Sequence, residues 1–207
     1  MSLPASRSDA PDAGRITEIL DERGPIADAA LDLIQRAFPP RERQPIQQIA
    51  MEIAEKRLEL LTSYDFHLLA ALSPRDEVMA VASGDYLGGV NTGFVTSQAV
   101  EKAFRGMQLG RRLRVALIDA FRQDARTLEW PELASVVGEV RLESPWLRRL
   151  VRDRAVLPLH LTYFHPGEDP RNPETEWILY RQPVDDNRLE LPAGEVRQLL
   201  YAIWRRA

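Results

Sequence analysis

The residues best suited to chemistry in this chain form a short basic stretch with two glycines, RGMQLG, at residues 105–110. Arg105 and the nearby Arg111 carry permanent positive charge, while Gly106 and Gly110 let the main chain approach a bulky anion closely. A helical pattern begins where this stretch ends, and the first N–H groups of a helix lack an intrahelical acceptor. Aligned peptide dipoles add partial positive charge at the same end. The stretch therefore favours a phosphate ligand.

Two elements must position this loop. Before it, an apolar segment ending in Gln98, Ala99 and Val100 is typical of a strand. After it, apolar residues recur every three or four positions, as expected for a helix with one buried face. The residues of that face are Leu109, Leu113, Ala116, Leu117, Ala120 and Phe121. A strand, a glycine-containing turn and the start of a helix together make an anion site.

This segment resembles the GNAT superfamily of acetyl-CoA-dependent N-acetyltransferases. The signature of that superfamily is Arg or Gln, two residues, Gly, one residue, then Gly or Ala, between the fourth strand and the next helix. Arg105 and Gly110 match the outer positions, Val100 stands where a strand-ending valine is usual, and Gln108 replaces the inner glycine. The resemblance implies acetyl-CoA as acyl donor, with its pantetheine arm between parted fourth and fifth strands. The implied cofactor-binding residues are Gln98, Ala99, Val100, Arg105, Gly106, Met107, Gln108, Leu109, Gly110 and Arg111.

The resemblance also implies the fold class. We expect an α/β (α+β) domain with a mixed, mostly antiparallel central sheet of six to seven strands, flanked by helices and extended by a C-terminal helix. Residues 1–14 form a predicted flexible tail, and residues 15–207 a single domain. The predicted strands are 15–22, 66–72, 77–86, one ending at 100, 134–140, 159–164 and 176–184. The predicted helices are 25–38, 45–63, one starting at 109, one opened by Ser144-Pro145 and ended by Pro158, and 195–206.

Transfer of an acetyl group to an amine needs a base for the amine, an N–H donor for the developing oxyanion and an acid for the leaving thiolate. Many relatives carry a glutamate base on the fourth strand, which this chain lacks. Glu139, on the predicted fifth strand, is the first substitute, and Asp85 and Glu101 are weaker candidates. The helix after that strand contains no tyrosine, so Tyr163 is the candidate acid. The main chain near Ala99 and Val100 would supply the N–H donor.

Gln108 leaves alternatives open, because its side chain could crowd the diphosphate or donate a hydrogen bond to it. The chain could instead be a CoA-binding regulatory or interaction module with little or no catalytic activity. A peptide- or protein-interaction domain would follow if Gln108 filled the diphosphate site.

Composition limits the classes of partner and site that this chain can have. The chain has 207 residues, a formal charge of −4 and no cysteine, which argues against general nucleic-acid binding and excludes thiolate sites. The three histidines show no metal-ligand spacing, so we expect no metal. Without a signal peptide or a long apolar stretch, we expect a cytoplasmic protein that acts on a small-molecule amine or on an amine of a peptide or protein. The exposed face of the C-terminal helix, with Trp204, could pair two copies into a homodimer.

Overall fold

The computed structural model describes residues 14–40, 42–60, 63–153, 155–165, 177–184, 188 and 190–206. Its centre is a seven-stranded sheet with the spatial order β1-β2-β3-β4-β5-β7-β6. The strands are β1 (Arg15–Glu18), β2 (Tyr64–Leu72), β3 (Val78–Leu87), β4 (Thr92–Val100), β5 (Ser135–Arg141), β6 (Leu157–Pro158) and β7 (Trp177–Pro183). The helices are α1 (Pro25–Ala37), α2 (Ile46–Arg57), α3 (Leu109–Thr127), α4 (Pro145–Arg152) and α5 (Ala193–Arg206), with short 3₁₀ turns η1 (Gly88–Val90) and η2 (Lys102–Phe104). This is the expected fold class.

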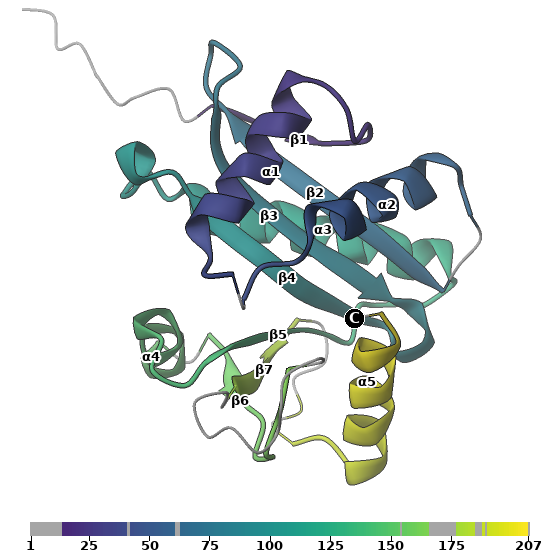
Figure 1. Cartoon of the computed structure of the whole chain (residues 1–207). Coiled ribbons are helices and arrows are strands. Elements are labelled where there is room, and N and C mark those ends of the chain that lie inside the picture. The colour runs from purple at the N-terminus through teal and green to yellow at the C-terminus, as the bar shows by residue number, and fades with distance from the viewer. Residues whose placement is uncertain are drawn as a thin grey trace, which may run out of the picture.

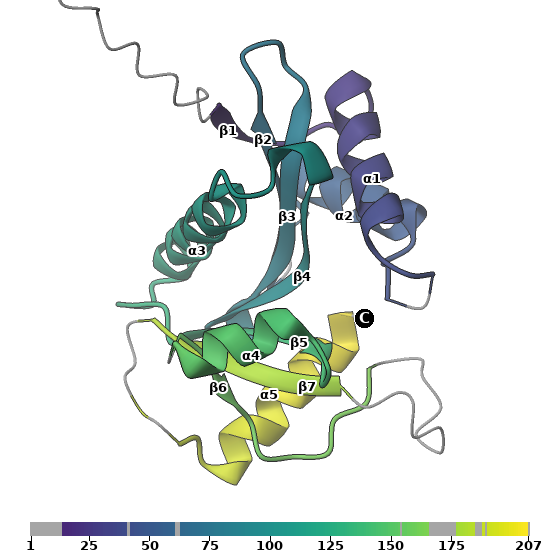
Figure 2. The same cartoon turned by 90° about the vertical axis from the view of Figure 1, so that its left-hand side faces the viewer.

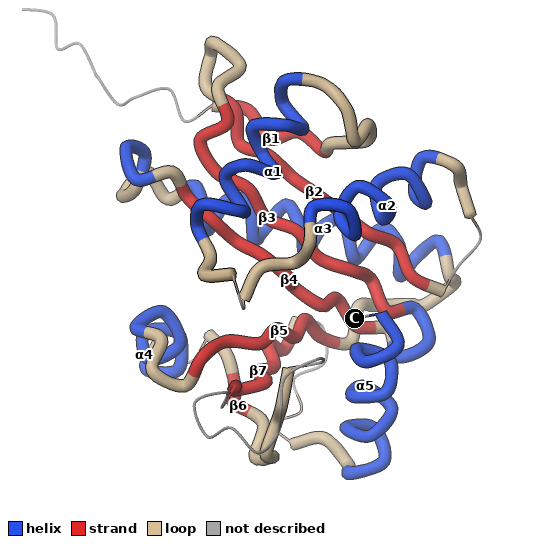
Figure 3. Tube along the Cα trace, in the orientation of Figure 1, coloured by secondary structure: helices blue, strands red, loops and turns tan. Residues whose placement is uncertain are grey.

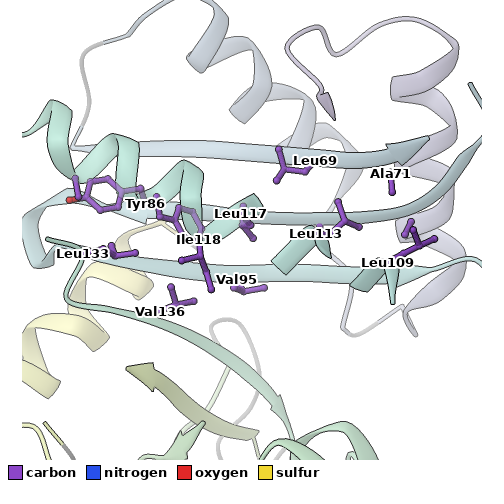
Figure 4. Packing of buried hydrophobic residues seen from close by; sticks show 14 of the residues in the cluster. Leu69, Ala71, Tyr86, Val95, Leu109, Leu113, Leu117, Ile118, Leu133 and Val136 are labelled. Atoms are coloured by element: carbon purple, nitrogen blue, oxygen red, sulfur yellow. The ribbon is translucent and has the colours of Figure 1, made fainter. Parts of the chain in front are cut away.

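The first four strands form an antiparallel sheet covered on both faces. Figures 1 and 2 show α1 and α2 on one face of β1–β4 and α3 on the other. The leucines of α3 recur every four residues, and Leu109, Leu113 and Leu117 are buried on β2, β3 and β4. Figure 4 shows these side chains between the helix and the strands. Burial of this stripe fixes the start of α3 beside the end of β4.

The last three strands carry one helix on each face. Side chains alternate along β7, so Leu179 packs toward α5 and its neighbour Tyr180 packs toward α4. In α5, Leu199 and Ile203 bury their side chains in the same cluster as Leu179. Figure 2 shows α4 and α5 on the two sides of β5 and β7. The second half of the sheet is thereby covered by a helix on each face, as the first half is covered by helices on both (Figure 2).

The two halves join through β4 and β5, the one parallel pair of neighbours among the described strands. Their pairing starts at Thr92↔Ser135 and ends at Val95↔Gly138, although both strands continue beyond that point. On its other side β4 has a bulge, because Ser83 pairs with Ser97 while Gly84 pairs with Val95. The extra residue, Thr96, lies where β4 parts from β5. Figures 1 and 3 show the two strands together at one end and diverging toward the other.

Three predicted boundaries differ from the structure by several residues. The first strand ends at Glu18 rather than at residue 22. Helix α2 ends at Arg57 rather than at 63, because Glu59 adopts φ 50° and its N–H and that of Leu60 bond back to Lys56 and Glu55, in a closing turn that terminates the helix. Helix α4 ends at Arg152, well before Pro158.

The predicted strand 159–164 is also wrong. The strand here is the two-residue β6, because the chain turns directly after it: Leu159 N still donates to Leu179 O at 2.9 Å, but Leu161 N bonds back to Leu159 O at 2.9 Å. Beyond the turn, an isolated bridge joins Tyr163 to Trp177. Residues 1–13 of the predicted tail lie outside the described residues. No helix in the described part of the chain is long and apolar enough to cross a membrane.

Candidate functional site

A cleft of about 730 Å³ opens where β4 and β5 separate. One wall is the free edge of β4 with the 105–110 loop and the start of α3. The other wall is β5 with α4 and Tyr180 of β7. Because Val95 and Gly138 are the last paired residues, the cleft narrows toward them and widens toward the loop. A long, thin ligand with a charged end fits this shape.

The loop at the wide end presents free amides to the cleft. The first helical hydrogen bond of α3 is donated by Arg112 N to Gln108 O at 3.1 Å, so the N–H groups of Leu109, Gly110 and Arg111 have no intrahelical acceptor. Gln108 adopts the left-handed conformation, with φ 56° and ψ 17°. Its side chain is exposed, so the residue takes the conformation a glycine would favour without filling the loop.

Gly110 makes a close contact within the same wall. The Gln98 amide Nε2 donates to Gly110 O at 2.6 Å, and a Cβ at position 110 would lie 2.9 Å from that nitrogen. This hydrogen bond ties the end of β4 to the first turn of α3. The backbone of the wall is therefore fixed before any ligand arrives.

Eight of the ten residues predicted to bind the cofactor line the cleft; they are Gln98, Val100, Arg105, Gly106, Gln108, Leu109, Gly110 and Arg111. The two that do not are Ala99 and Met107. Ala99 faces the core under α1, because side chains alternate along β4, and Met107 packs on the α3 core. The assignment of this segment to cofactor binding stays a prediction.

Glu139 and Tyr163, the two predicted catalytic residues, are in contact. The Tyr163 hydroxyl donates to Glu139 Oε2 at 2.7 Å, and His165 Nδ1 lies 2.6 Å from Glu139 Oε1. Burial, followed by the charge of Glu139 and this hydrogen bond, raises the pKa of the Tyr163 phenol. Tyr163 is not among the described residues that line the cleft, so it lies against the candidate base rather than against the cleft.

A second, smaller pocket of about 200 Å³ lies on the α2 and α5 face of the sheet. Thr96 and Glu139 line both this pocket and the cleft, so the two spaces meet where β4 and β5 part. Asp85 and Glu52 lie at the wall of the pocket with Arg206. Burial and the charge of Asp85 raise the pKa of Glu52 to about 7.

Asp85 is committed to an ion pair. Arg206, the last residue of α5, donates to Asp85 Oδ1 at 2.7 Å and lies 3.5 Å from Glu52. The Asp85 side chain is 1% exposed, and burial raises its pKa. The other weak candidate, Glu101, accepts a hydrogen bond from Arg36 at 3.2 Å. Neither contact assigns or removes a catalytic role.

Sequence reasoning missed Arg114, Tyr180 and His165. Arg114 lines the cleft one helical turn after Gly110, a spacing that places both on one side of α3 and could have been noticed. Tyr180 reaches the cleft from β7, and His165 reaches Glu139 from beyond β6. No local pattern marks these two, because strand order brings them to the site.

A separate polar cluster lies between α2, β2 and α3. Asp65, His67 and Asp124 each offer one atom that could bind a metal ion. These three atoms lie within 4.8 Å of one another, as a metal site would require. The Lys56 ammonium already sits in this cluster, 3.3 Å from Asp65 and 2.8 Å from His67 Nδ1. The sequence-based expectation of no metal stays a prediction.

Comparison with known proteins supports the architecture. No family model and no curated protein matched the chain. Among solved structures, the ribosomal-protein-S18-alanine N-acetyltransferase from Escherichia coli matches with a TM-score of 0.54 and 18% identity, covering 86% of this chain and 98% of that chain. An acetyltransferase of the GNAT family from Staphylococcus aureus Mu50 matches with a TM-score of 0.52 and 10% identity, covering 85% and 100%. The chain has the GNAT fold.

A third GNAT-fold neighbour, the ribosomal-protein-alanine N-acetyltransferase from Brucella melitensis, matches with a TM-score of 0.56 and 14% identity, covering 82% of this chain and 99% of that chain. Each of these proteins is matched over nearly its whole length. Within this fold, the candidate site depends on the order of strands and on the parting of β4 from β5.

Proposed function

We propose that this chain is an acyl-CoA-dependent N-acyltransferase that carries an acyl group, acetyl in the simplest case, to an amine acceptor. The observation that carries the proposal is the end of β4–β5 pairing at Val95↔Gly138, which opens a cleft between the first turn of α3 and Glu139. The acceptor would be a small-molecule amine or an amine of a peptide or protein.

The residues at the wide end of the cleft suit the charged part of CoA. Three first-turn amides and the exposed side chains of Arg105 and Arg111 would surround a diphosphate bound at this end. The free edge of β4 beyond Val95 offers main-chain partners for a pantetheine arm, and Val140 and Trp146 supply apolar walls. When bound, acyl-CoA would supply an activated thioester carbonyl.

Glu139 is our assignment for the base. Its side chain is 9% exposed and faces both the cleft and the second pocket, where an amine arriving from the α2 face would meet it. Tyr163 and His165 hold the two carboxylate oxygens and fix their direction. We assign Tyr163 to positioning Glu139, in place of the acid role inferred from sequence, because its hydroxyl is directed at that carboxylate.

Tyr180 is our assignment for the proton donor to the leaving thiolate. Its ring lies over Gly138, with the hydroxyl 2.3 Å from where a Cβ on that glycine would stand. The hydroxyl is therefore at the point where β4 and β5 part, on the α4 face. A phenol there can give a proton to a group at the narrow end of the cleft.

One observation favours a second candidate, a CoA-binding module without transfer activity. Both oxygens of Glu139 are already engaged, which leaves fewer lone pairs for an acceptor amine. In that case the cleft would bind CoA but the amine would keep its proton.

Binding and turnover separate the two candidates. Acetyl-CoA at ~100 times its dissociation constant should add ~2.7 kcal/mol of stability, measured as a thermal shift. Release of free CoA thiol is then followed with a panel of small amines and of peptides with free N-termini and lysines. Binding with turnover supports the enzyme, binding without turnover on any acceptor supports the module, and no thermal shift at that excess refutes both.

A further inference from the structure

Arg114 is held across the inner part of the cleft by partners from β7 and α4. Its Nε donates to Gln182 Oε1 of β7 at 2.7 Å, and its Nη1 donates to the Tyr180 hydroxyl at 3.4 Å. The guanidinium carbon lies 5.5 Å from the centre of the Trp146 ring of α4 and 5.6 Å from that of Tyr180. These contacts fix the direction of a cation in a wall of the cleft.

The third nitrogen, Nη2, is buried and has no hydrogen-bond partner in the described part of the protein. Arg114 also has no carboxylate within ion-pair distance among the described residues. Gln182 and Tyr180 each accept from one of the other two nitrogens, but both are neutral and supply no counter-charge. A buried donor left unpaired is costly, and a buried charge more so, because neither regains what it loses on leaving water. An anionic oxygen in the cleft would accept a hydrogen bond from Nη2 and would balance the charge of the guanidinium.

The position of Arg114 identifies which part of a ligand this oxygen belongs to. Tyr180, whose hydroxyl meets Nη1, lies over Gly138, and Gly138 belongs to the last β4–β5 pair. The guanidinium is therefore at the narrow end of the cleft. The free amides of α3 that suit a diphosphate are at the other end, one helical turn earlier. A ligand with its diphosphate on those amides would place its acyl end beside Arg114.

We propose that Arg114 binds a carboxylate at the far end of the acyl group, so that the preferred donor is the CoA monothioester of a short dicarboxylic acid. This inference rests on the proposed function. The transfer itself is unchanged: the acceptor nitrogen forms the C–N bond, the C–S bond breaks, Glu139 takes the amine proton, Tyr180 gives a proton to the sulfur, and the distal carboxylate keeps its charge. A charge-assisted hydrogen bond from Nη2 to that carboxylate provides the selectivity.

Glu139 does not compete for this guanidinium. Successive residues of a strand point to opposite faces, and Gly138 faces Tyr180 and α4 while Glu139 faces Tyr163 and His165. The base thus acts from the acceptor side of the gap, and the arginine from the α3 and α4 side. A carboxylated acyl chain would enter the arginine side without meeting the carboxylate of Glu139.

Binding of matched donors to the wild-type protein is the first test, and it needs no acceptor. Succinyl-CoA and butyryl-CoA have acyl chains of the same length and differ at the end of the chain, a carboxylate against a methyl group. Calorimetry should give a dissociation constant for succinyl-CoA about tenfold or more below that for butyryl-CoA, the size expected of one charge-assisted hydrogen bond. Equal affinities, or a preference for butyryl-CoA or acetyl-CoA, would overturn the proposal.

Variants of Arg114 then test whether this residue causes the preference for succinyl-CoA. In Arg114→Met the preference for succinyl-CoA should vanish while butyryl-CoA binds as before, and in Arg114→Lys part of the preference should return. Arg111→Met, which removes an exposed arginine at the diphosphate end, should weaken both donors by the same factor. Thermal melts of each free variant establish that it is folded; if Arg114→Met does not fold, Arg114→Lys and the wild-type comparison still decide.

Two other outcomes are distinguishable. Equal weakening of CoA, butyryl-CoA and succinyl-CoA in Arg114→Met would mean that Nη2 serves the pantetheine arm, which overturns the carboxylate assignment and leaves the acyltransferase proposal standing. Failure of all CoA compounds to bind the wild-type protein would instead refute the proposed function itself.

Discussion

The Tyr163 hydroxyl donates to Glu139 Oε2 over 2.7 Å, so two residues separated by α4 and β6 in the chain act as one unit. His165 holds the other oxygen, Oε1, at 2.6 Å. Burial and the charge of Glu139 raise the pKa of the phenol, which keeps its proton available to the carboxylate. Glu139 is thereby held at the meeting point of the cleft and the second pocket.

Replacing Glu139 should separate catalysis from cofactor binding. For Glu139→Gln we expect kcat to fall by about 100-fold, the usual loss when a general base is removed, with the dissociation constant of acetyl-CoA unchanged. Tyr163→Phe should lower kcat by only about tenfold, since His165 still holds one oxygen. Steady-state kinetics with any acceptor found by the panel, together with calorimetry, measures both. Normal turnover by Glu139→Gln would show that another group takes the proton.

Charge reversal at the start of α3 should remove CoA binding and leave the fold intact. Arg111 is exposed and lines the cleft, so Arg111→Glu should weaken CoA by about tenfold or more through lost attraction to the diphosphate. The matched control is Arg126→Glu, an exposed charge reversal in the last turn of the same helix. Calorimetric titration with CoA compares the two. Equal effects of both reversals would point to net charge rather than to a diphosphate site.

The ion pair between Arg206 and Asp85 should anchor α5 to the sheet. Arg206→Met leaves the buried Asp85 carboxylate unpaired and should lower the free energy of unfolding by about 3 kcal/mol. In the double variant Arg206→Met with Asp85→Asn, part of this loss should return, because the unpaired charge is gone. Urea denaturation of the wild type, Arg206→Met, Asp85→Asn and the double variant measures these free energies and completes the double-mutant cycle. A single Arg206→Met variant as stable as the wild type would mean that apolar packing alone holds α5.

His67 should make stability fall at alkaline pH. Burial alone lowers the pKa of His67, but hydrogen bonds to Asp124 and Glu18 and the charge of Asp124 outweigh burial and raise it to about 9. A raised pKa means that the folded state binds the proton more tightly than the unfolded state, where the value is near 6.5. The contribution is complete below that value and is lost as pH rises through about 9, and its full size is roughly 3 kcal/mol. Denaturation between pH 6 and pH 10 should show the decline, and His67→Gln should flatten it. A wild-type curve as flat as that of the variant would show that His67 is neutral in the folded protein.

The sequence by itself determined the elements around the anion site. The leucine period of α3, the apolar end of β4 and the glycines between them are local properties of one continuous segment, and all were predictable from residue spacing. The strands β2, β3 and β5 were predicted in the same way, from local patterns. Local patterns also gave a wrong helix end: α2 was predicted too long, because the left-handed turn at Glu59 has no sequence signal.

Tertiary structure alone decided which side chains meet in the gap. Tyr163, His165 and Tyr180 reach the site from different segments, through strand pairings that residue spacing does not encode. The place where β4 parts from β5 depends on where their pairing ends and on the bulge at Thr96, which are properties of the whole sheet. The unpaired nitrogen of Arg114 became visible only once β7 and α4 were in position, because burial is a property of the fold and not of the residue.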